Sequence, residues 1–153
     1  MRYTLLIVVL VIFFTACKKD KFTTAPQIAF KSVSPNYAYS SIPITQQNIP
    51  ILTISVTDAE GDLGFIDGKD TSKVYIKNLL TNRQDSIILP NISSVAVKDF
   101  KGDIAINLGA FLAGSSRPRP KTDTLYFEIY VKDFAKNKSN VIQSSAPVYY
   151  ITP

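Results

Sequence analysis

From Gln27 to the end of the chain, apolar and polar residues alternate in short stretches that are separated by turn-forming residues. The clearest stretches are 51–57, 73–79 and 124–132, in which about every second residue is apolar. Because the side chains of a strand point alternately to opposite faces, a period of two predicts strands with one buried face. No segment after Gln27 shows a 3.6-residue period long enough for a substantial helix, so the pattern predicts an all-β domain.

Shorter stretches complete the predicted set of strands, at 27–33, 85–89, 93–97, 103–108 and 141–151. Residues 81–83 form a short turn between two strands, which predicts a hairpin. Residues 37–48 indicate a long connection or a weak edge strand, and residues 109–120 a loop that begins with one helical turn. Seven to eight strands without intervening helices are typical of a two-sheet sandwich.

The N-terminal residues have the pattern of a secretory signal rather than of a strand. Arg2 precedes an uninterrupted apolar run at 5–14, which is too short to span a bilayer, and small residues then lead into Cys17. The tetrapeptide Phe14-Thr15-Ala16-Cys17 resembles the lipobox of bacterial lipoproteins, apart from Phe14 at a position where leucine is usual. The resemblance implies that residues 1–16 are a lipoprotein signal peptide and that Cys17 becomes the acylated first residue of the mature protein.

The lipobox resemblance also implies a location. Acyl chains such as palmitate on Cys17 would make the protein a cell-envelope lipoprotein of the outer membrane, on its periplasmic or its surface face. Residues 17–26 are polar and rich in lysine, and we interpret them as a tether between this anchor and a domain at 27–153.

The side chains that the chain lacks exclude several classes of enzyme. The chain has no histidine, and its single cysteine is the expected lipidation site. Ser-His-Asp and Cys-His catalysis and His-ligated zinc are therefore excluded. The acidic residues lie in polar, glycine-containing turns, without the apolar cleft that a glycoside hydrolase needs to keep one carboxyl group protonated. A net charge of +5 is no signature of nucleic-acid binding. We expect a protein that is not an enzyme.

Two turn-rich motifs carry a second resemblance. Residues 58–64 read DAEGDLG after one strand, and residues 131–139 read VKDFAKNKS at the end of a later one. Together they are similar to immunoglobulin-like domains of Bacteroidetes-type secreted lipoproteins. The resemblance implies an immunoglobulin-like sandwich over 27–151, without the Cys and Trp core of antibody domains, and it implies no catalytic residues.

The same motifs contain candidate ligands for a hard cation. Acidic residues alternate in the first motif, and an immunoglobulin-like topology would bring the second motif to the same pole. Oxygen atoms that converge in this way fit Ca2+, which binds six or more of them. The candidate ligands are Asp58, Glu60, Asp62, Asp133, Asn137 and Asn140. The alternative is that these residues are ordinary turn formers whose charges are neutralised by nearby lysines.

Tyrosines form a second candidate site. Tyr126 and Tyr130 share the outer face of the predicted strand 124–132, and Tyr75 is expected on the same face of a neighbouring strand. Tyr149 or Tyr150 would add a fourth ring. Such a row suits stacking on sugar rings or a protein partner, whereas the alternative is that cross-strand aromatic pairs only stabilise the sheet.

A small basic patch follows from Arg117, Arg119 and Lys121, which alternate with prolines. No helix N-terminus or glycine-rich loop accompanies it, so we expect a solvated loop rather than a phosphate site.

Two functions therefore remain open. The domain is either a non-catalytic binding module for a glycan or an envelope protein, or a structural spacer or assembly component of an envelope complex, stiffened by Ca2+ at one pole. In both, the membrane is a partner through the lipid anchor.

Overall fold

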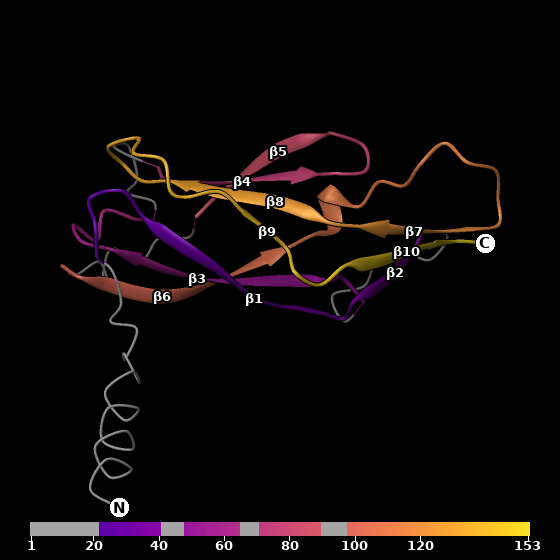
Figure 1. Cartoon of the computed structure of the whole chain (residues 1–153), viewed down its shortest axis with the longest axis horizontal. Helices are drawn as coiled ribbons and strands as arrows, with labels where there is room; N and C mark the ends of the chain where they lie inside the picture. Colours follow the sequence, from indigo (N-terminus) through magenta and orange to yellow (C-terminus); the bar gives the residue numbers. More distant parts are fainter. Residues whose placement is uncertain (1–21, 41–47, 65–70, 90–97) are drawn as a thin grey trace, which may run out of the picture.

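The computed structural model of the chain describes residues 22–40, 48–64, 71–89 and 98–153, and the regular secondary structure of this part is almost entirely β-strand (Figure 1). The one helix in these residues is a single 3-10 turn, η1 (Gly109–Phe111), at the place where the sequence predicts one helical turn. The strands are β1 (Gln27–Ser34), β2 (Tyr37–Tyr39), β3 (Ile51–Asp58), β4 (Lys73–Asn78), β5 (Gln84–Ile88), β6 (Phe100–Asn107), β7 (Lys121–Leu125), β8 (Phe127–Lys132), β9 (Ile142–Gln143) and β10 (Val148–Thr152). The prediction of an all-β domain after Gln27 is confirmed for the described residues.

One layer of the fold is the antiparallel sheet β1-β3-β6, with β3 in the middle. Along β3, every second residue is buried, and these residues include Leu52, Ile54 and Val56. These three are the residues whose apolar alternation predicts the inner face of the strand, so the local sequence pattern alone determines which side of β3 meets the core.

The second layer is assembled from two sheets, β5-β4-β8-β9 and β2-β10-β7. Only Tyr126 separates β7 from β8, and β10 pairs with β7 just as β9 pairs with β8. The predicted strand 124–132 thus spans both sheets, and the predicted strand 141–151 becomes β9 and β10. The two sheets therefore continue into one another as one layer.

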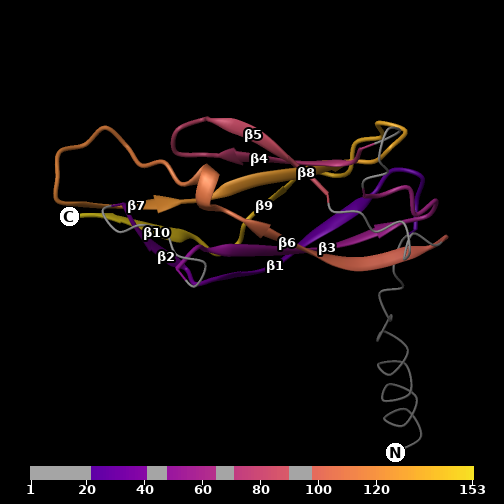
Figure 2. The same ribbon diagram turned by 180° about the vertical axis from the view of Figure 1, so that it is seen from behind.

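The two layers pack face to face as a β-sandwich (Figure 2). The order β1-β3-β6 opposite β4-β8-β9 is the arrangement of immunoglobulin-like domains. After β1 the chain crosses to the other layer, where β2 pairs with β10 in parallel. Buried apolar side chains from both layers form the core, and the largest of them are Phe127, Leu52, Ile54, Leu63, Ile76, Ile106, Leu108, Leu125 and Ile129.

The loops after β3 and β8 meet at one end of the sandwich. The backbone N–H of Phe134 donates to the carbonyl of Asp62 at 3.0 Å, which joins the two loops directly. The backbone N–H of Ala59 donates to the carbonyl of Thr23 at 3.1 Å, so the chain also enters the sandwich at this end. We call this end, defined by residues 58–64 and 133–140, the acidic pole.

Several sequence predictions lie outside the described residues. They are the signal peptide at 1–16, the lipidation site Cys17 with the first part of the tether, and the short strand at 93–97. Within the ranges that the structure does describe, no helix has the length and apolar character needed to cross a membrane.

Candidate functional site

Three carboxylates gather at the acidic pole. Asp58 ends β3, Asp62 lies in the loop that follows, and Asp133 directly follows β8. One oxygen of each lies within 4.8 Å of the others. Asp58 and Asp133 have no exposed surface at all, so two of the three charged groups are buried inside the fold.

Backbone hydrogen bonds hold these side chains in place. The N–H of Asp62 donates to Oδ2 of Asp58 at 3.1 Å, and the N–H of Ala135 donates to Oδ2 of Asp62 at 3.4 Å. Gly61 has a φ of 66°, a left-handed conformation that a glycine adopts without strain, and this turns the chain between the two acids. The two loops therefore orient the acids of the pole toward one another.

The close approach of these groups changes their acidity. Burial, together with contact with the Asp62 carboxyl group and its charge, raises the pKa of Asp58 to about 7. Burial also raises the pKa of Asp133, and the charges of Asp62 and Glu60 add to this rise, although hydrogen bonds from Asn137 oppose it. The surroundings of Asp58 and Asp133 thus disfavour their ionised forms, and a bound cation would favour them.

The other predicted ligands have different places. Glu60 is exposed and outside the group of three. Asn137 supports Asp133, because its backbone N–H and its side-chain amide donate to the two carboxylate oxygens at 2.7 and 2.9 Å. Asn140 is bound elsewhere: its side chain accepts from the N–H of Ile28 and donates to the carbonyl of Ile28, at 2.7 and 2.9 Å. Asn140 therefore ties the β8–β9 connection to β1, and its predicted part in the cation site is wrong.

Two of the predicted tyrosines form a stacked pair on the outer face of β4 and β8. Tyr75 and Tyr130 are directly opposite in the register, with ring centroids 4.6 Å apart and ring planes at 8°. Tyr126 is partly buried between β7 and β8, and the described residues give it no ring contact. Tyr149 is exposed on β10, whereas Tyr150 packs against the core.

Lysines surround the stacked pair. The ammonium group of Lys138 lies 4.1 Å from the ring centre of Tyr130, and that of Lys132 lies 5.7 Å from the ring centre of Tyr75. Because each ring has its partner ring on one side and a lysine over it, little ring surface is left for stacking on a sugar. The structure therefore favours cross-strand stabilisation as the role of the aromatic contact itself.

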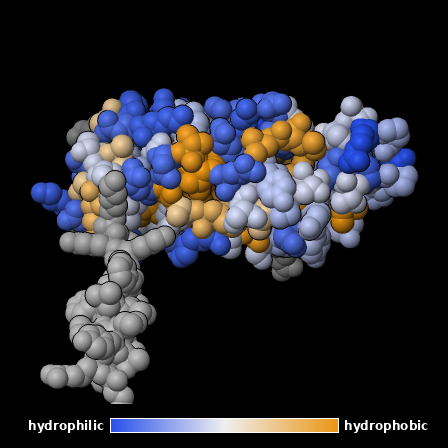
Figure 3. Space-filling model, in the orientation of Figure 1, coloured by the Kyte–Doolittle hydropathy of each residue, from blue (hydrophilic) through white to orange (hydrophobic). Residues whose placement is uncertain are grey.

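A small hollow of about 180 Å³ lies beside this pair, lined by Thr71, Lys73, Tyr75, Lys132 and Lys136. Lys73 and Lys132 are direct cross-strand neighbours, and Lys136 donates to the carbonyl of Thr71 at 3.2 Å. We call Lys73, Tyr75, Tyr130, Lys132, Lys136 and Lys138 the lysine–tyrosine face. In the space-filling view, hydrophilic residues gather along the edge of the molecule that carries β4, β5 and β8 (Figure 3).

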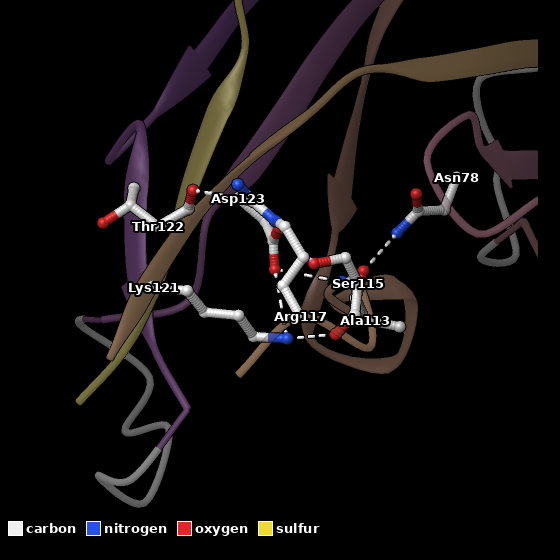
Figure 4. A network of polar contacts seen from close by, with 7 residues as sticks. All are labelled: Asn78, Ala113, Ser115, Arg117, Lys121, Thr122 and Asp123. Carbon is white, nitrogen blue, oxygen red and sulfur yellow. Dashed lines mark hydrogen bonds and ion pairs between the residues drawn. The ribbon is translucent and has the colours of Figure 1, made fainter. Parts of the chain in front are cut away.

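The predicted basic patch is only partly a solvated loop. Asp123 of β7, 1% exposed, accepts a hydrogen bond from Arg117 at 2.7 Å and lies 3.6 Å from the ammonium group of Lys121 (Figure 4). Ser115 donates to the same carboxylate through its N–H and its hydroxyl group, at 2.9 and 2.7 Å. Arg117 and Lys121 are therefore structural partners of a buried acid, and Arg119 is exposed on the loop between them.

Sequence reasoning missed Asp123, and it also missed Asn78. Asn78 is buried at the end of β4, and its amide donates to the carbonyls of Phe111 and Ala113 at 3.1 and 3.0 Å. These residues fix the loop after η1 against the sandwich. The sequence signal for Asp123 and Asn78 is that each is polar at a position where the alternation of the strand predicts a buried side chain.

Comparison of the chain with protein-family models, with curated proteins and with solved structures gave no match. The function of this chain must therefore be inferred from its own sequence patterns and the geometry of its sites.

Proposed function

We propose that this chain is a cell-envelope lipoprotein, anchored through Cys17, whose sandwich is a non-catalytic binding module for an anionic glycan. The signal pattern and lipobox resemblance of residues 1–17 support the anchor. The lysine–tyrosine face supports an anionic ligand, because it holds four lysines around a small hollow.

The observation that carries the proposal is the placement of Lys73 directly opposite Lys132. Like charges at directly opposed positions of neighbouring strands are destabilising. Elsewhere on the same two strands, Lys77 faces Glu128, so an acid opposite a lysine is compatible with this sheet. The opposed lysines therefore keep positive charge at the hollow at a cost to the fold, and an anion bound there would offset that cost.

Lys136 and Lys138 also add positive charge to the lysine–tyrosine face without forming an ion pair among the described residues. In the part of the chain that the structure describes, the ion pairs involve Lys31, Arg117 and Lys121 and none of the four lysines of the lysine–tyrosine face. A hollow of about 180 Å³ has room for one small charged group rather than for a protein surface. A carboxylate or sulfate group on a sugar matches the charge and size, and the Tyr75 ring, which lines the hollow, would supply apolar contact with the sugar.

Titration calorimetry tests this proposal on the full chain in detergent micelles. We expect polygalacturonate to bind and neutral dextran not to bind, with an affinity that falls as salt is added. Lys73→Gln combined with Lys132→Gln should weaken binding at least about 10-fold, which corresponds to ~1.4 kcal/mol.

The matched control is Lys31→Gln with Lys77→Gln, which removes the same charge from β1 and from the far end of β4. An equal loss in this control would show nonspecific attraction and would contradict a site at the hollow. Absence of binding to any anionic glycan, with capture of an acidic protein instead, would reassign the face to a protein partner. Absence of both would favour the spacer function.

The anchor has its own test. Cells expressing the chain and fed a labelled fatty acid should incorporate the label, and Cys17→Ser should abolish incorporation and release the protein from the membrane fraction. Unlabelled protein in the soluble fraction would contradict the lipoprotein assignment and leave the glycan site to be judged separately.

A further inference from the structure

The acidic pole contains acceptor atoms that the described part of the fold leaves unsatisfied. Oδ1 of Asp58 and Oδ1 of Asp62 are buried, and neither has a hydrogen-bond partner among the described residues. Asp58 as a whole has no exposed surface. A buried carboxylate oxygen without a donor is costly, because it has lost its water and gained nothing in return.

No cation of the described chain compensates these charges. The ion pairs among the described residues lie at Lys31–Asp103 and around Asp123, and none involves Asp58, Asp62 or Asp133. Lys136 is close in sequence to Asp133, but its ammonium group donates to the carbonyl of Thr71. The pole therefore holds three clustered carboxyl groups, and no basic side chain of the described residues forms an ion pair with any of them.

The remaining hydrogen bonds fix the acids in position. Both oxygens of Asp133 accept from Asn137, and one oxygen each of Asp58 and Asp62 accepts a backbone N–H. In both Asp58 and Asp62, a backbone N–H therefore holds Oδ2, while Oδ1 of the same carboxylate has no partner among the described residues. This is a rigid arrangement of the kind that positions ligands around an ion.

The spacing agrees with a calcium ion. Ca2+ binds oxygen atoms at about 2.3–2.6 Å, so two ligands on opposite sides of one ion lie about 5 Å apart and neighbouring ligands lie closer. The three oxygens of the pole are all within 4.8 Å of one another. Carboxylate oxygens without imidazole or thiolate select hard cations over transition metals.

We propose that Asp58, Asp62 and Asp133 bind one Ca2+ ion, which joins the end of β3 to the turn after β8. If each carboxylate binds through one oxygen, the three acids supply three of the six to eight oxygens that Ca2+ requires, and water molecules or backbone carbonyls would complete the coordination. The proposal concerns a different set of residues from the glycan site and does not depend on it. The competing explanation is a proton shared between Asp58 and Asp62.

Calorimetry and thermal unfolding of the full chain in detergent micelles at pH 7.5 test the site. Titration with CaCl2 after removal of metal by EGTA should show one ion bound per chain. Because the ion binds the native state selectively, the unfolding temperature should rise by about 5 °C or more in 5 mM CaCl2 relative to EGTA.

Asp62→Asn and Asp133→Asn should abolish the calcium-dependent rise, because each removes the charge of a ligand while nearly preserving its shape. Asp85→Asn is the matched control, since Asp85 is an exposed acid on β5, and it should retain the full rise. Circular dichroism in EGTA establishes that each variant is folded before calcium is added. Asp58→Asn provides a second ligand variant if either of the others fails to fold.

Three results would overturn the proposal. The first is no heat and no change in unfolding temperature of the unmodified chain in 5 mM CaCl2, as a shared proton predicts. The second is a loss of the calcium effect in Asp85→Asn as large as in Asp62→Asn. The third is an equal effect of Mg2+, which prefers octahedral sites at shorter distances and would exclude a site selective for Ca2+.

Discussion

Replacing Asp123 by asparagine tests how a buried charge holds the loop after η1 against β7. The carboxylate is 1% exposed and accepts hydrogen bonds from Arg117 and from two groups of Ser115. Gly114 passes so close that a Cβ there would meet Oδ2 of Asp123, so the loop is fitted to this side chain. Asparagine has the same shape, but it lacks the charge and turns an NH2 group toward one of the donors.

The size of the effect follows from these contacts. A hydrogen bond to a charged group contributes about 1.5–3 kcal/mol, but the Arg117 side chain is 63% exposed, so water screens its share. The two bonds from Ser115 are better shielded, because Ser115 is partly buried. We therefore expect Asp123→Asn to lower the free energy of unfolding by about 2–4 kcal/mol at pH 7.

The effect should depend on pH in a defined direction. Burial alone would raise the pKa of Asp123, but hydrogen bonds from Arg117 and Ser115 and the charge of Lys121 outweigh burial and hold it below the ordinary value of 3.8. Below pH 3.8 the unfolded chain therefore binds a proton more readily than the folded chain does. The stabilisation by Asp123 is fully present above this pH and is lost as the pH falls through the lower, folded-state pKa.

Urea unfolding at pH 7 and pH 3, followed by circular dichroism, measures both parts of this prediction. The control is Asp103→Asn, which removes an acid from the 2.6 Å ion pair with Lys31, where both side chains are about half exposed. It should cost less than about 1 kcal/mol. The reasoning is refuted if Asp123→Asn costs no more than this control at pH 7, or if its cost is the same at both pH values.

Two further predictions concern contacts between strands. Asn140→Ala should lower the free energy of unfolding by about 1–3 kcal/mol, because the backbone N–H and C=O of Ile28 both lose their partner. A thermal unfolding curve identical to that of the unmodified chain would contradict this prediction. A double-mutant cycle of Tyr75→Ala and Tyr130→Ala should give a coupling energy of about 0.5–1.5 kcal/mol from urea unfolding, and additive effects would show that the stacked rings do not interact.

The strands and their inner faces could be predicted because alternation is a local property. The positions of Leu52, Ile54 and Val56 follow from neighbouring residues alone, and so does the hairpin turn, where Asn82 adopts a φ of 59°. The split of the predicted strand at Tyr126 could not be foreseen, because the apolar alternation continues through it without a break. The change of sheet there depends on pairing with distant strands.

The candidate sites, too, could be predicted only where local sequence and strand order are sufficient. Asp58, Asp62 and Asp133 come together as expected, because strand order brings their two loops to one pole. Asn140 belongs to the second of these loops, yet its side chain binds Ile28 of β1, and no local signal in the sequence distinguishes these two outcomes. Arg117 and Lys121 pair with Asp123 only because the loop folds back on β7, which the sequence spacing does not reveal.

If Cys17 carries the proposed lipid anchor, the contact between Ala59 and Thr23 would determine which end of the sandwich lies near the membrane. Thr23 follows Cys17 by six residues. Because an extended chain covers at most ~3.5 Å per residue, the acidic pole would then remain within about 20 Å of the lipid. The opposite end of the long axis, where β2, β7 and β10 lie, is then the distal end (Figure 1). A calcium ion at the acidic pole would then lie close to phospholipid headgroups. The exposed Tyr37, Tyr39 and Tyr149 would lie at the end that points away from the membrane, where a binding partner in the surrounding solution would reach them first.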